Sequence, residues 1–295
     1  MLGFAPISST PISALPAVVS TGPTLVASGT SASTATELTR NITLPTWSVG
    51  ANDWIFLEFA SGAGVSSPTA TPTASGYTEV FLRRNTNGST MGLYVKQAVS
   101  GDSGSTVGTT YAAAQTMSWK VRIYSGSGGL GAVAITPSTD TSLAATTSPA
   151  TPAITPNVSS GSVIASMFTS RVTANGTAST VTTPPAGLTD PLEAATTAAS
   201  TTNHRAASYD TGSYSSPTAS QTAVYSATGY TVSATYEVLA AAGGPILQDL
   251  TASLGFSTAS APDLCTNGGF EVDTAPPATR GRAGARSGSA TASSG

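Results

Sequence analysis

The feature that most constrains the fold is the stretch from Gly76 to Val99, in which β-forming residues flank the pair Asn87-Gly88. An Asn-Gly pair accepts the positive φ angles of a two-residue turn, whose twist matches that of paired antiparallel strands. The stretch therefore predicts a β-hairpin. Because side chains alternate between the two faces of a strand, one aliphatic face of the hairpin should be directed at the core. That face comprises Val80, Leu82, Leu93 and Val95.

The opposite face of the predicted hairpin pairs Phe81 with Tyr94 and Glu79 with Lys96. Aromatic side chains dominate both cores and interfaces, so we expect Phe81 and Tyr94 to pack against a second layer, from another sheet or an adjacent subunit. The alternative is that these two rings form a platform for a glycan ligand.

Strand candidates recur at short intervals on both sides of the hairpin. Only 8% of the residues are charged, against about 25% in an ordinary soluble domain, and this composition favours short strands over amphipathic helices. The glycine-rich segment 126–131 is interpreted as a flexible connection. The strand candidates are 24–28, 37–44, 52–60, 77–84, 90–99, 116–124, 163–168 and 230–239. We predict an all-β fold, an antiparallel β-sandwich of the jelly-roll-like kind.

The order of the elements before residue 136 recurs after it, which indicates an internal repeat. We predict that two quasi-repeats, 23–136 and 137–240, together build one sandwich over 23–240. A chain of 295 residues also allows two small sandwiches, divided near Pro137.

Both ends of the chain are expected to be less regular than the sandwich. Prolines at five-residue intervals exclude a helix in residues 1–22 and favour an extended arm, although a disordered terminus is the alternative. The arm carries four apolar residues that need a partner surface to cover them: Phe4, Ile7, Ile12 and Leu15. Residues 241–295 are expected to form a linker, a short helix and a low-complexity tail with too few apolar residues to fold alone.

The residues needed for common enzyme chemistry do not come together in the sequence. Gly101-Asp102-Ser103-Gly104 and Gly29-Thr30-Ser31-Ala32 resemble the nucleophile motifs of serine proteases, but the single histidine, His204, follows both serines instead of preceding them. We expect these tetrapeptides to be turns and His204 to be a surface or packing residue. One cysteine and one histidine leave no Cys/His cluster for a metal. The sequence therefore predicts no enzyme, no cofactor and no metal site.

The charge and hydropathy patterns argue against several partners. The formal net charge is −3, and the basic residues are scattered, so binding to nucleic acid has little electrostatic support. No apolar run approaches the ~18 residues of a membrane span. The first basic residue is Arg40 and prolines interrupt the apolar start, so we expect no signal peptide.

One repeated pattern resembles a known class of proteins. The segment Pro184-Pro185-Ala186-Gly187-Leu188-Thr189 follows a strand and precedes a hairpin, as Gly76-Tyr77-Thr78-Glu79 does in the first half. This arrangement resembles a two-repeat β-sandwich domain in virion surface proteins of tailed bacteriophages. The opening GFAPI…PISA also resembles the N-terminal attachment peptides of such proteins. The resemblance covers roughly residues 1 to 240 and implies a non-enzymatic virion component.

These observations lead to an expected function. The protein would be made in the host cytoplasm and docked on the virion surface, through residues 1–22, to capsid, portal or tail proteins. It would display the sandwich as a tail fibre, head fibre, spike or host-attachment module, with a host surface glycan as a ligand and a homotrimer as the assembly expected by analogy. The alternatives are a capsid decoration protein and a secreted glycan-binding or hydrolytic protein.

Overall fold

The computed structural model describes residues 22–62, 70–72, 76–158, 161–172, 178–197, 203–212 and 219–241, all of which belong to one compact unit. Within these ranges the chain forms strands and no helix, which confirms the all-β prediction. The strands are β1 (Thr24–Ala32), β2 (Glu37–Thr43), β3 (Trp54–Ser61), β4 (Ala70–Pro72), β5 (Thr78–Asn85), β6 (Ser89–Gln97), β7 (Thr106–Gln115), β8 (Met117–Ser125), β9 (Ser127–Thr136), β10 (Val163–Val172), β11 (Val181–Thr183), β12 (Thr189–Ala195), β13 (His204–Asp210), β14 (Val224–Tyr225) and β15 (Gly229–Ala240).

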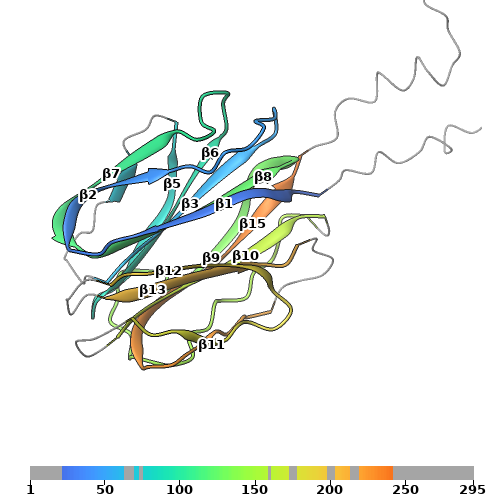
Figure 1. The fold of residues 1–295 in the computed structure, drawn as a ribbon. Helices are drawn as coiled ribbons and strands as arrows, with labels where there is room; N and C mark the ends of the chain where they lie inside the picture. The colour runs from blue at the N-terminus through green and yellow to red at the C-terminus, as the bar shows by residue number, and fades with distance from the viewer. Residues whose placement is uncertain are drawn as a thin grey trace, which may run out of the picture. The chain divides into compact units, whose positions relative to one another are not determined.

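Two five-stranded antiparallel sheets form the body of the molecule (Figure 1). The first sheet has the strand order β1-β8-β3-β6-β5, and the second has the order β9-β15-β10-β13-β12. The two orders are equivalent: when the five strands of each sheet are counted along the chain, both sheets have the spatial order first, fifth, second, fourth, third. Gly76 and Gly187, which both have positive φ, precede the two corresponding edge strands, β5 and β12.

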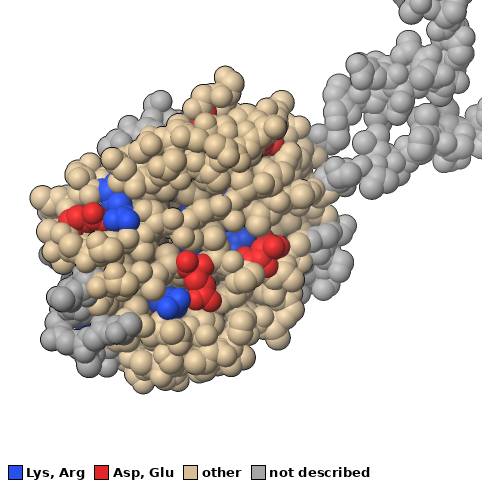
Figure 2. All heavy atoms as spheres, viewed as in Figure 1, with Lys and Arg blue, Asp and Glu red and all other residues tan. Residues whose placement is uncertain are grey.

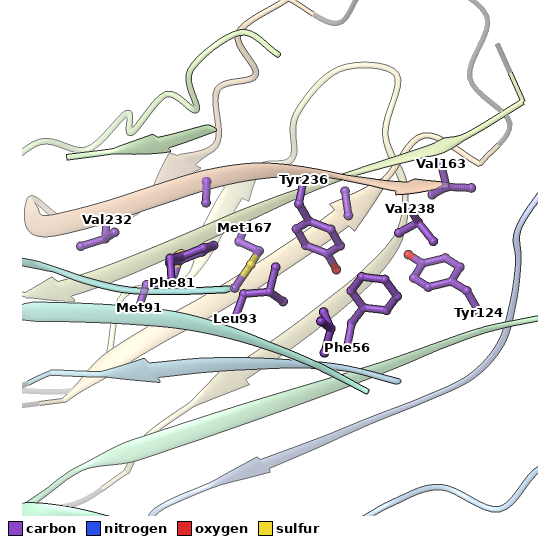
Figure 3. Close-up of a cluster of buried hydrophobic side chains, with 13 residues drawn as sticks. Phe56, Phe81, Met91, Leu93, Tyr124, Val163, Met167, Val232, Tyr236 and Val238 are labelled. Carbon is purple, nitrogen blue, oxygen red and sulfur yellow. The ribbon is translucent and has the colours of Figure 1, made fainter. Parts of the chain in front are cut away.

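The two sheets pack face to face around an apolar core (Figure 3). The ring of Phe56 on β3 stacks on that of Tyr236 on β15, with a centroid separation of 5.4 Å. Phe81, Met91 and Leu93 come from the first sheet and meet side chains of the second. The members from the second sheet include Val163, Met167, Val232 and Val238. This core explains the alternation of apolar residues along β6 and β15.

Each large sheet is also covered on its outer face, so its central strands are buried on both sides. The small sheet β2-β7-β4 and its flanking loops cover the first sheet, where Leu57, Trp119 and Val121 form a second core with Ile42 and others. The pair β11-β14 contributes Tyr225 to a third core on the second sheet. Burial on both faces accounts for the almost continuous apolar run of β3.

The predicted hairpin forms, but its predicted register is wrong by one residue. Asn85 pairs with Ser89, and Gly88 N donates to Asn85 O at 2.9 Å, so three residues form the turn. The buried Asn85 side chain fixes this closure, because it donates to Leu143 O and accepts from Leu143 N, both at 3.1 Å. These partners come from a distant segment, which a local turn signal does not include.

The shifted register puts the two aromatic residues, which were predicted on one face, on opposite faces of the first sheet. Phe81 pairs with Leu93, not Tyr94, and a bulge separates Glu79 from Phe81. Phe81 therefore faces the second sheet, whereas Tyr94 faces outward, with its ring centroid 5.9 Å from that of Trp119. The expected Glu79–Lys96 pair is also replaced, since Lys96 Nζ lies 2.6 Å from Asp102 Oδ1.

The segment interpreted as a flexible connection is a strand. Residues 127–136 form β9, which pairs with β15 in the second sheet. The chain passes from one sheet to the other at Gly126, so β9 belongs structurally with the second segment and not with 23–136. The predicted arm residues Phe4, Ile7, Ile12 and Leu15 and the tail 242–295 lie outside the described residues. In the described part of the chain, no helix is long and apolar enough to span a membrane.

The core between the sheets should dominate stability. Leu93→Ala removes a side chain that is 0% exposed and should lower the free energy of unfolding by about 2–5 kcal/mol, because it leaves a cavity. Leu38→Ala, at a position that is 52% exposed, is the matched control and should change it by no more than about 0.5 kcal/mol. Urea unfolding of both variants measures the difference; equal losses would contradict the placement of this core.

Candidate functional site

The polar side chains of β8 are buried between the two large sheets. The alternation of Lys120 and Arg122 with Trp119 and Val121 predicts a strand with one solvent-exposed face. In the structure both faces of this strand are buried. The side chains of Lys120 and Arg122 are 1% and 0% exposed. A charge removed from water to this extent needs partners. The partners form what we call the inter-sheet polar cluster: Glu58, Lys120, Arg122, Tyr124, Asp210 and Tyr236.

Arg122 is the centre of this cluster and joins three strands. Its Nη1 donates to Asp210 Oδ2 at 2.8 Å, and its Nη2 donates to Ser208 O at 2.9 Å. Nη2 also donates to Asp190 O at 2.6 Å, so the guanidinium contacts both β13 and β12. Asp190 has a φ of 50°, an uncommon conformation for a residue other than glycine, and it directs its carbonyl at Arg122. The planar fork of arginine matches this set of acceptors.

Glu58 receives contacts from both sheets. The hydroxyl of Tyr236 donates to its Oε1 at 2.8 Å, and Lys120 Nζ lies 3.1 Å from its Oε2. Burial by itself raises the pKa of Glu58, but the ammonium of Lys120 and the guanidinium of Arg122 outweigh burial and hold the pKa below its usual value. Burial lowers the pKa of Lys120, and the carboxylate of Glu58 opposes that shift. Glu58 is therefore an anion matched to its cations.

The single histidine lies in the same layer. His204 is 0% exposed, and its Nε2 is 2.9 Å from Ser118 Oγ on β8. The expectation of a packing residue thus fits its position. The two protease-like serines lie elsewhere: Ser103 Oγ donates to Trp47 O at 2.8 Å within a loop, and Ser31 is on strand β1, where it accepts a hydrogen bond from Arg40. The second tetrapeptide is therefore not a turn.

A cleft opens at one end of the polar cluster and is the candidate binding site. It has a volume of about 520 Å³ and lies between the start of β1 and the adjoining ends of β12 and β13. Two acidic residues and several apolar residues line it. The lining residues are Gly22, Pro23, Thr24, Leu25, Tyr124, Val163, Asp190, Asp210 and Gly212.

Asp210 connects the cleft to the cluster. Burial raises the pKa of Asp210, although the charge of Arg122 acts in the opposite direction. Its Oδ2 accepts from Tyr124 OH at 2.8 Å as well as from Arg122, and its Oδ1 accepts from Gly212 N at 3.0 Å. These donors hold the carboxylate in one orientation. Asp190 is exposed, so its carboxylate can accept hydrogen bonds from a ligand that carries hydroxyl or amino groups.

The two residues predicted as an interface or glycan platform are not on the surface of this chain. Phe81 is 3% exposed and Tyr94 is 2% exposed, and they lie in different cores. The one-residue register shift, together with covering layers on both sides of the first sheet, explains the difference. Each of the two rings packs against a second layer, which is the first of the two alternatives for these residues.

Sequence reasoning missed the polar cluster, although a signal was present. In a chain with 8% charged residues, Glu58 stands within a run of apolar residues, and two cations alternate with Trp119 and Val121 on another strand. Charges in strands that are otherwise apolar indicate a buried pair. In the described part of the chain, no group of three or more His, Cys, Asp and Glu side chains is placed to hold a metal ion. No protein-family model, curated protein or solved structure matches the chain.

The pair between Arg122 and Asp210 gives a direct test of the cluster. Asp210→Asn keeps the shape but removes the nearer of the two carboxylates that face the buried guanidinium, at 2.8 Å against 3.6 Å for Glu58, so the free energy of unfolding should fall by about 3–5 kcal/mol. Asp190→Asn is the matched control, since its side chain is exposed and asparagine tolerates positive φ; it should change stability by no more than about 0.5 kcal/mol. Denaturant unfolding measures both, and similar small effects would show that the ion pair is not needed.

Proposed function

We propose that this chain is a non-enzymatic structural protein of a tailed-phage virion, attached through residues 1–22 and displaying its β-sandwich outward as a fibre, spike or host-attachment module. The observation that carries the proposal is that the buried ionisable groups form ion pairs with one another. Arg122 pairs with Glu58 in its own sheet and with Asp210 in the other sheet, as expected of a protein that works by its shape.

The surface supports the same proposal. Figure 2 shows a face made mostly of uncharged residues, on which acidic and basic side chains lie beside each other in a few places. Arg205 and Glu193, with 2.7 Å between Nη1 and Oε2, form one partly exposed ion pair of the protein. A surface of small polar residues with little net field suits a module that is displayed in many copies without repelling its neighbours. The motif resemblance described above supplies the virion context.

Deletion of residues 2–16 tests the attachment. A phage that encodes the shortened protein should produce particles that lack it, because the apolar residues of the arm would be missing. Electron microscopy with a labelled subunit measures incorporation and also shows whether the sandwich projects or lies flat on the capsid, as a decoration protein would. The purified deletion variant should unfold at the same denaturant concentration as the full chain, which controls for misfolding. Normal incorporation would refute the attachment role.

The cleft favours a second candidate function, that of a glycan-binding module. An acidic wall beside Leu25 and Val163 offers acceptors for sugar hydroxyls and an apolar surface for a sugar ring. If this is correct, the purified protein should bind on a glycan array, and Asp190→Ala should abolish that binding. The turnover of the bound glycans should stay at background. If no glycan on the array binds, the structural role is the remaining candidate. Measurable turnover would instead point to a hydrolase.

A further inference from the structure

Lys120 and Glu58 are placed for more than an ion pair. They lie directly opposite each other on the neighbouring strands β8 and β3. Their side chains are 1% and 0% exposed, and Nζ is 3.1 Å from Oε2. The surroundings are buried and partly aromatic. Phe56, two residues before Glu58 on the same face of β3, stacks on Tyr236. An amine and a carboxyl group are thus held together away from water.

The contact is close but poorly aligned. Glu58 Oε2 is buried and accepts no well-aligned hydrogen bond, although Lys120 Nζ lies 3.1 Å from it. The nitrogen is therefore not aligned with a lone pair of the carboxylate in the way that a stable salt bridge requires. An unaligned pair of buried charges gains less than an aligned one while it bears the same cost of desolvation.

The two oxygens of Glu58 have different surroundings. Oε1 accepts a hydrogen bond from Tyr236 OH at 2.8 Å and lies 3.6 Å from Arg122 Nε. Oε2 faces the lysine nitrogen. A hydroxyl donor and a cation at one oxygen are the arrangement that stabilises negative charge on that oxygen during attack at a carbonyl carbon. The other oxygen is then the one that leaves.

The geometry points to a covalent bond: we propose that Lys120 Nζ and Glu58 Cδ condense to an amide that links β8 to β3 in the folded protein. A proton moves from the ammonium to Oε2, and the resulting amine attacks Cδ. The C–N bond forms, and Oε1 carries the negative charge against Tyr236 OH and Arg122. The bond from Cδ to Oε2 then breaks, and Oε2 leaves as water with a second proton from Nζ.

The reaction balances without any other reactant. One carboxylate and one ammonium give one amide and one water, so no oxidant, cofactor or metal takes part. Holding the two groups in contact supplies the effective concentration that the condensation needs. Burial favours the neutral amine, since the desolvation of Lys120 lowers its pKa, and the exclusion of water opposes hydrolysis of the product. Tyr236 is the catalytic residue of this step, because its hydroxyl touches the reacting carboxyl group.

The mass of the intact full-length chain, measured under denaturing conditions, tests the proposal. The linked protein should be lighter than its sequence by one water molecule. After digestion with trypsin, Lys120 should resist cleavage, and the peptide of residues 41–83 should be found joined to the peptide of residues 97–122. A chain with its full sequence mass overturns the proposal, and so does a loss of water located at any other pair of residues.

Three variants separate the bond from other causes of mass loss. Lys120→Met should show its full sequence mass. Glu58→Gln should lose one ammonia molecule in place of water, since the amide nitrogen then leaves. Tyr236→Phe removes the hydroxyl at Oε1 and should slow the condensation by about 100-fold or more, so that newly made protein remains largely unlinked. The matched control is Tyr225→Phe, at a buried tyrosine whose hydroxyl has no partner in the described part of the chain, and it should link as the parent does.

Discussion

The structure depends on the ion pair between Arg122 of the first sheet and Asp210 of the second. A guanidinium buried to this degree must be matched by an anion and by hydrogen-bond acceptors, or the folded state loses several kcal/mol. The acceptors all come from β12 and β13, so the sheets can pack only with β8 over this part of the second sheet. Hydrophobic burial drives the sheets together, because it is proportional to area and has no direction. The ion pair determines how the two sheets are aligned.

A defined alignment matters because the two sheets have the same strand order. Two similar sheets with apolar inner faces could meet in more than one alignment, each burying a comparable area. In this protein the inner faces differ across their width: β6 and β15 are apolar where they face each other, whereas β8 and β13 are polar. A slipped alignment would separate Arg122 from Asp210 and from the backbone acceptors of β12 and β13. The polar cluster therefore selects one alignment among those that burial alone permits.

The sequence predicts the parts of this fold that depend on local pattern. Alternation locates β5, β6 and β8, and turn residues mark their ends. It does not predict β9, whose glycines and alanines have little strand preference and which is a strand only because β15 lies beside it. The hairpin register fails for the same reason, since Asn85 is fixed by Leu143. The cluster joins residues far apart in the chain, such as Glu58 and Tyr236, so a single sequence can indicate that charges are buried but not which residues pair.

The ion pair between Arg122 and Asp210 also fixes the geometry of the cleft. Asp210 is held by Arg122 and Tyr124 on one side and contributes to the wall of the cleft on the other. Arg122 also holds the backbone of Asp190, the exposed acid at the mouth. A ligand that bound there would meet carboxylates positioned by the contact that aligns the two sheets. Binding would then need little reorganisation of the protein, because folding has already fixed these side chains and borne the entropic cost of ordering them.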